Sequence, residues 1–224
     1  MLRPVLLAAI LSGTIAGGAL SLVQSLWVIP LIHRAEVYEQ AAAQQAPAPD
    51  RESAPAEADP SEGDPARTIY TVLTNLLIGI AFGLLLTSAF SLRGGADPAR
   101  GVLWGLAGFV TFALAPALGL PPELPGAEAA GVSARQAWWG AAVVLTGGGL
   151  SLVLLTGRLT WVLVGCVLVA LPHLIGAPQP AEHGALAPEA LAREFLSASL
   201  LTNFAFWVVL GGLAGFFYRR STAA

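Results

Sequence analysis

The sequence has 224 residues, of which 55% are hydrophobic and only 11% are charged. A soluble domain carries about 25% charged residues, so a chain this apolar cannot cover a water-exposed surface with polar groups. The formal net charge is −3, and all 11 basic residues are arginines that form no basic stripe. Nucleic acid is therefore excluded as an expected partner.

The apolar residues come in six blocks of about the length that crosses a bilayer. A helix needs roughly 20 mainly apolar residues for this, because each residue adds about 1.5 Å of rise. The predicted spans are 5–32, 68–92, 101–120, 138–156, 159–175 and 195–218. We expect an all-α integral membrane protein, a single bundle of about six transmembrane helices. The fifth span is the shortest, and a five-span alternative stays open.

The arginines predict the orientation, because they are enriched in cytoplasmic loops. With the N-terminus inside, the cytoplasmic set is Arg3, Arg93, Arg100, Arg158, Arg219 and Arg220, and the outer set is Arg34, Arg51, Arg67, Arg135 and Arg193. Asp97 is the one acidic residue of the 14 that falls on the cytoplasmic side. We expect a bacterial inner-membrane protein with both termini in the cytoplasm, which requires an even number of spans.

Residues 40–67 separate the first two spans and are rich in alanine, proline and acidic residues. This composition lacks the apolar side chains of a packed core, so it predicts a disordered external loop. A solvated linker is the main interpretation, and a loose attraction of cations by its carboxylates is the alternative.

Glycines recur four residues apart inside the predicted spans. The pairs are Gly13 with Gly17, Gly79 with Gly83, Gly101 with Gly105, and Gly211 with Gly215. In lipid, such pairs let helices approach closely. They predict a tight bundle or a homo-oligomer and indicate no particular chemistry.

The spans lack the carboxylates of a proton relay, and the chain lacks the common motifs of nucleotide-dependent and hydrolytic enzymes. The spans contain no Asp, Glu, Lys or Arg, which disfavours a carboxylate-driven proton pump. The chain has no Gly-rich nucleotide loop, no nucleophile elbow and no metalloprotease helix, so no enzyme is predicted. Its single cysteine, Cys166, excludes an internal disulfide and a Cys-rich zinc site.

Imidazole and carboxylate groups gather at the predicted outer face. His33 is followed by Glu36 and Glu39, and on a continuing helix each would neighbour the next. Such groups together suit divalent metals such as cobalt, nickel or zinc. The alternative is that a boundary His or Glu bonds to lipid headgroups or caps a helix.

Two further candidate ligands follow prolines near the outer ends of spans. His173 follows Pro172, which frees the carbonyl group of Leu168, and Glu123 follows two prolines. A proline-broken helix end that lines a cavity can coordinate cations. The odd-numbered spans carry their prolines in corresponding places, at Pro30, Pro116 and Pro172. One interpretation is three related hairpins converging on one outer mouth; the other is that proline is common near membrane helix ends.

Polar residues near these ligands are candidates for lining a path. Gln24, Asn75 and Asn203 are amides inside the spans, and they either line a path or bridge helices. Arg135 is a candidate to orient Glu123 through a bidentate ion pair. Trp207 is either part of an aromatic belt at the membrane boundary or a core aromatic.

Several strings of the sequence resemble the CbtA family of predicted cobalt transporter subunits, in order and over nearly the whole chain. They are WVIPLIHRAEVYE, EGDPART, PALGLPPELPG, ARQAWW and LPHLIGAP. The resemblance implies cobalt uptake for cobalamin biosynthesis. It also implies a small single-span, His-bearing partner subunit of the CbtB kind. That family is usually described with five spans, against the six predicted from hydropathy and charge.

The resemblance also implies which positions matter. The motifs correspond here to Glu36 with Glu39, to Glu123, to Arg135 with Gln136, and to His173. Relatives carry extra histidines in the first external loop, and this chain has none between His33 and Thr68.

These features leave three candidate functions. The first is a divalent metal permease for cobalt, with an outward-facing metal site of His33, Glu36, Glu39, Glu123 and His173. Its pathway residues are Gln24, Asn75, Arg135, Gln136 and Asn203. The second is a non-transporting scaffold subunit of a metal-uptake complex. The third, a haem or quinone protein, requires facing histidines inside the bundle. We expect cobalt as the transported substrate and no organic cofactor. The sequence leaves open whether the metal is cobalt, nickel or another one.

Overall fold

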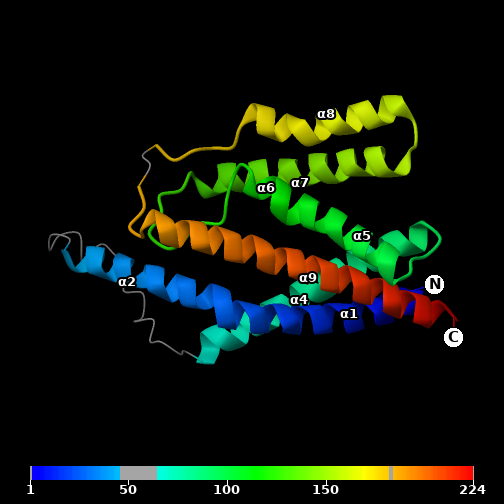
Figure 1. Ribbon diagram of the computed structural model, residues 1–224, viewed down its shortest axis with the longest axis horizontal. Helices are drawn as coiled ribbons and strands as arrows, with labels where there is room; N and C mark the ends of the chain where they lie inside the picture. The colour runs from blue at the N-terminus through cyan, green and yellow to red at the C-terminus, as the bar shows by residue number, and fades with distance from the viewer. Residues whose placement is uncertain (1, 46–64, 182–183, 224) are drawn as a thin grey trace.

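The regular structure of the chain is helical in the computed structural model, which describes residues 2–45, 65–181 and 184–223 (Figure 1). In chain order the segments are α1 (Leu2–Val23), η1 (Gln24–Val28), α2 (Ile29–Gln45), α4 (Pro65–Leu92), α5 (Pro98–Phe109), η2 (Val110–Leu114), α6 (Ala115–Ala117), α7 (Val132–Leu155), α8 (Leu159–Ile175) and α9 (Glu189–Ala223). The segments η1 and η2 are single π-helical turns inside longer helices. The predicted all-α class is confirmed.

Both termini lie at one end of the molecule, which we call the terminal end (Figure 1). The loops 93–97 and 156–158 lie at this end too. The opposite end, which we call the distal end, holds the last turns of α2 and α8 and the first turns of α7 and α9. The chain therefore runs along the long axis an even number of times, as the arginine distribution predicts.

Five helices of the described residues are long and apolar enough to cross a membrane. They are Leu2–Gln45, Pro65–Leu92, Pro98–Ala117, Val132–Leu155 and Glu189–Ala223. The sixth apolar helix, α8, has 17 residues, which corresponds to about 26 Å of rise against a hydrocarbon core of about 30 Å. All six predicted apolar helices are present, and the chain is a multi-pass membrane protein. A complete crossing by α8 stays a prediction.

Two helices extend beyond the boundaries expected for the acidic loop 40–67. The first helix continues to Gln45 and α4 begins at Pro65, so residues 40–45 and 65–67 are helical. The residues there are mainly Ala and Gln, with Arg67, and these good helix formers continue a helix outside the apolar part. The rest of the predicted disordered loop, 46–64, lies outside the described residues.

Glycines set the closest contacts between α1 and α4. A Cβ atom on Gly13 would overlap the backbone of Gly79 and Ile80, and one on Gly17 would overlap the backbone of Asn75. Two helical backbones come this close only where side chains are absent. The Gly pairs of the first two spans therefore face each other, as the tight-bundle prediction requires.

The same arrangement joins α5 and α9. A Cβ atom on Gly101 would overlap the carbonyl group of Gly211, and one on Gly215 would overlap the carbonyl group of Asp97. A third glycine contact, between Gly149 and Gly165, joins α7 and α8. In addition, α1 packs along α9 and so connects the first two pairs.

These pairs correct the three-hairpin interpretation. Consecutive hairpins would pair the third span with the fourth and the fifth with the sixth. Instead α5 packs mainly on α9, and α7 packs mainly on α8, so α1–α4 is the one of the three predicted hairpins whose helices pack mainly on each other. The interpretation was wrong because it used proline positions, whereas the position of the glycines decides which helices approach closely.

The buried side chains form two clusters. The larger, around Phe90, Trp207 and Leu210, lies among α1, α4, α5 and α9. Trp207 is 1% exposed, so its core assignment is the correct one. The second, which we call the distal cluster, joins α2 and α9 to two loops at the distal end. Its members are Val28, Leu31, Ala35, Leu124, Ala187, Leu191, Phe195 and Ala198.

Proline does not break the first helix, contrary to the prediction of proline-broken ends. The π-turn η1 precedes Pro30, and the N–H of Ile29 donates to the carbonyl oxygen of Gln24, five residues earlier. The π-turn η2 precedes Pro116 at the same offset. The wider turn shifts the hydrogen-bond register ahead of the residue that lacks an N–H, so the first helix continues to Gln45.

Candidate functional site

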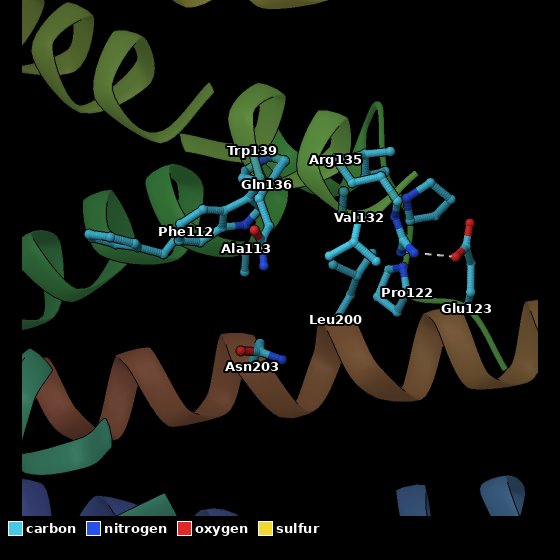
Figure 2. A pocket seen from close by; sticks show the side chains of 14 residues that line it. Phe112, Ala113, Pro122, Glu123, Val132, Arg135, Gln136, Trp139, Leu200 and Asn203 are labelled. Carbon is cyan, nitrogen blue, oxygen red and sulfur yellow. Dashed lines mark hydrogen bonds and ion pairs between the residues drawn. The ribbon is translucent and has the colours of Figure 1, made fainter. Parts of the chain in front are cut away.

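An ion pair between Glu123 and Arg135 lies at the distal end. The Nη2 atom of Arg135 donates to Oε2 of Glu123 across 3.0 Å, and both side chains are about one-third exposed. Figure 2 shows this contact as a dashed line beside the prolines that line the pocket. The pair expected from the sequence is present, with one hydrogen bond in place of the bidentate geometry.

Two structural elements position this pair. Arg135 projects from the first turn of α7, and its N–H donates to the carbonyl oxygen of Gly131. Glu123 lies in the loop that follows α6, where the next residue, Leu124, is buried in the distal cluster. The loop is also bridged at Ala127 to the segment before α9.

The ion pair lines a cavity of about 440 Å³ between α6, α7 and α9 (Figure 2). We call it the inner cavity. Its lining includes four residues that the sequence singled out, namely Glu123, Arg135, Gln136 and Asn203. The rest of the lining is mainly apolar: Phe112, Ala113, Pro116, Ala117, Leu120, Pro121, Pro122, Val132, Trp139 and Leu200. Charge in this cavity is therefore confined to its Glu123–Arg135 wall.

A second cavity of about 320 Å³, which we call the outer cavity, lies on the loop side of the same ion pair. It is lined by Gly119, Leu120, Pro121, Glu123, Glu128, Ala130, Arg135, Pro178, Gln179, Pro180, Gly184 and Ala185. The two cavities share Leu120, Pro121, Glu123 and Arg135. A carboxylate missed by sequence reasoning, Glu128, belongs to this site; its place five residues after Glu123 in one loop was the available signal.

The candidates on α2 lie elsewhere at the distal end. Oε1 of Glu36 accepts a hydrogen bond of 2.7 Å from Arg67 of α4, and the Glu36 side chain is 17% exposed. His33 is half-buried and Glu39 is exposed on the same helix. The grouping of His33, Glu36 and Glu39 required a helix that continues past His33, and that helix is present. Within it, Glu36 is paired with an arginine.

His173 lies on α8, where its ring meets the edge of Trp138 with centroids 6.0 Å apart. The indole Nε1 of Trp138 donates to the carbonyl oxygen of Pro172 across 3.2 Å. Helices α2 and α8 lie on opposite edges of the bundle, with α9 between them (Figure 1). The third histidine of the sequence, His183, lies outside the described residues.

The described residues therefore do not bring the five predicted ligands into one metal site. Within residues 2–45, 65–181 and 184–223, no three His, Cys, Asp or Glu side chains are close enough to hold a metal ion. Of the five candidates, Glu123 is the one that lines the two cavities.

The amides of the first two spans bridge helices. Nδ2 of Asn75 on α4 donates to Oε1 of Gln24 across 2.7 Å and to Oγ of Ser21 across 3.1 Å. Asn75 is 7% exposed. Of the two interpretations of these amides, the helix-bridging one is observed at Gln24 and Asn75.

Replacing Asn75 by alanine is expected to loosen the α1–α4 pair. The change removes two interhelical hydrogen bonds, each worth about 0.6 kcal/mol on average in a membrane protein, so unfolding should become easier by about 1 kcal/mol. Thermal unfolding in detergent measures this. Asn203→Ala is the comparison, because Asn203 donates to Ser199 of its own helix across 3.0 Å and should change stability less. Equal losses for both variants would contradict the bridging role.

The family model described as "Probable cobalt transporter subunit (CbtA)" matches residues 2–219 of the chain. The match covers every helix described above almost to the end of α9. Comparison with curated proteins and with solved structures gives no match.

Proposed function

Because the chain belongs to the family of probable cobalt transporter subunits, CbtA, we propose that it admits divalent cobalt across the bacterial inner membrane for cobalamin biosynthesis. The observation that carries this proposal is the pair of cavities at the distal end, which share one carboxylate, Glu123. A carboxylate at the mouth of a cavity between helices is where a cation would first lose part of its water shell. No enzymatic activity is part of the proposal.

In this proposal the distal end faces outward and both termini are cytoplasmic. Four distal arginines have a glutamate partner, in the pairs Arg34–Glu194, Arg67–Glu36, Arg135–Glu123 and Arg193–Glu189. Among the described residues, the arginines outside these ion pairs and the Arg100–Asp97 pair are Arg3, Arg93, Arg158, Arg219 and Arg220, and they belong to the helix ends and loops of the terminal end. An excess of arginine marks the cytoplasmic side of membrane proteins.

We assign the first contact with the cation to Glu123 and a supporting role to the other predicted ligands. His33, Glu36, Glu39 and His173 would concentrate cations at the same end without forming one coordination shell. Imidazole and carboxylate groups suit divalent first-row metals, which fits cobalt and does not discriminate strongly against nickel.

Glu123→Gln is the test of this assignment. The substitution keeps the size of the side chain and removes the charge that attracts the cation. We expect the initial rate of cobalt influx into liposomes to fall about tenfold, the change that roughly 1.4 kcal/mol of lost attraction gives. Glu189→Gln is the matched control, because Glu189 lies at the same end but is 82% exposed and lines neither cavity. Influx that is equal in both variants would contradict the role of Glu123.

The alternative function is a scaffold subunit that does not itself conduct. One observation favours it: the described residues hold no cluster of three metal-ligating side chains. The same liposomes decide between the two functions, with the chain alone and with a single-span, His-bearing partner subunit. Cobalt influx by the chain alone contradicts the scaffold; influx that requires the partner supports it.

A further inference from the structure

We infer that the Glu123–Arg135 ion pair is a gate between the outer and inner cavities, and that a divalent cation opens it by taking the place of Arg135 on the Glu123 carboxylate. This inference rests on the proposed function and adds to it the route of entry and the role of Arg135, a residue that binds no metal itself.

The position of the pair carries the first step. Both side chains line both cavities, together with Leu120 and Pro121. Among these four shared residues, Glu123 and Arg135 are the polar ones. An ion that passes from the outer cavity to the inner one must therefore pass beside these two charges. The 3.0 Å contact closes this passage.

The two partners also belong to different parts of the fold. Glu123 is held to α2 and α9, because the adjacent Leu124 is 6% exposed and packs in the distal cluster. Arg135 belongs to the α7–α8 pair, which is tied together by the Gly149–Gly165 contact and by the hydrogen bond from Trp138 to Pro172. That pair reaches the rest of the bundle mainly through η2 and α6. A small displacement of α7 would thus separate Arg135 from Glu123 without disturbing either core cluster.

The strength of the pair suits a gate. Side chains that are about one-third exposed form a weak ion pair, because water screens their attraction. A divalent cation in the outer cavity carries twice the charge of the guanidinium group and competes for the same carboxylate. Arginine does not lose its proton, so it has to move away when the cation arrives. The carboxylate of Glu128, which lines the outer cavity too, offers Arg135 a second partner of opposite charge.

Thiol labelling of the full-length protein in intact cells tests this gate. In a Cys166→Ser background, Asn203→Cys reports on the inner cavity and Gln179→Cys on the outer cavity, with a membrane-impermeant reagent added outside. Removing the pair by Arg135→Gln should speed labelling at position 203 about threefold to fivefold without metal, since an exposed pair biases an equilibrium by about that factor. Cobalt ions should produce a similar increase while Arg135 is present.

Two further variants separate gating from damage to the fold. Arg135→Lys keeps a positive charge and should label slowly at position 203, as the parent does. Glu123→Gln should label fast and show no further response to cobalt. Labelling at position 179 should be the same throughout. The gate is refuted if Arg135→Gln and Arg135→Lys label position 203 alike, or if cobalt has no effect on the parent. A gate that responds to cobalt in a chain that supports no influx would instead refute the proposed function alone.

Discussion

Gly211→Ala is expected to destabilise the protein by about 3 kcal/mol, the upper range for adding a methyl group to a closely packed contact. A Cβ atom at this position would overlap the carbonyl oxygen of Gly101 and lie 2.9 Å from the Cα atom of Gly105. These are backbone atoms, so no side-chain rotation relieves the overlap. Helices α5 and α9 have to move apart, and the dispersion contacts along both are weakened together.

The control is Gly148→Ala on α7. No heavy atom lies within 4 Å of the position that its Cβ would take. Alanine is favoured over glycine inside a helix by about 1 kcal/mol, so this variant should be as stable as the parent or slightly more stable. Thermal unfolding in one detergent compares the two variants directly. Equal unfolding temperatures would show that the glycine contact does not hold α5 to α9.

The glycine contacts illustrate how far the sequence determines this fold. The positions of the helices follow from blocks of apolar residues, and their close approach follows from glycines four residues apart. The partner of each helix does not follow, because Gly101 and Gly105 match Gly79 as well as they match Gly211. The observed choice, α5 with α9, depends on the shapes of all the helices together and has no local signal.

The π-turns ahead of Pro30 and Pro116 are a second feature that the sequence does not predict. Pro30 and Pro116 mark helix ends when a proline is assumed to interrupt an α-helix. A π-turn ahead of each one shifts the hydrogen-bond register, and the first helix then runs on past His33 and Glu36. A proline signals a missing donor, but it does not say whether the chain ends its helix or widens one turn.

At the candidate site, the predictions made from charge were the most useful. The pairing of Glu123 with Arg135 was expected and is observed. The predicted grouping of His33 with His173 was based on both lying at one end of the bundle. The structure puts them on helices at opposite edges of that end (Figure 1). Sequence patterning gives the depth of a residue along a helix, whereas its position around the bundle requires the packing.

Trp207→Ala is expected to have the second large effect, about 3 to 5 kcal/mol of destabilisation, as for other buried tryptophans. Its ring stacks on Phe112 at an interplanar angle of 12° and lies 4.6 Å, between centroids, from the ring of Phe82. Gly108 leaves the space that the ring occupies, since a Cβ there would overlap it. In lipid, helices are held together mainly by dispersion contacts rather than by the hydrophobic effect, so the stabilisation lost with the ring is mainly dispersion energy.

This substitution also links the core to the proposed entry route. Phe112 packs on Trp207 with one face and lines the inner cavity as well. Without the indole ring, Phe112 loses its support, so cobalt influx at a temperature where the variant is folded should change along with stability. The matched control is Trp27→Ala, because Trp27 is 41% exposed; it should shift the unfolding temperature by less than a quarter as much and leave influx unchanged. If both variants unfolded alike, the stacked aromatic core would not be what holds α5 and α9 beside α4, and the inner cavity would need a different support.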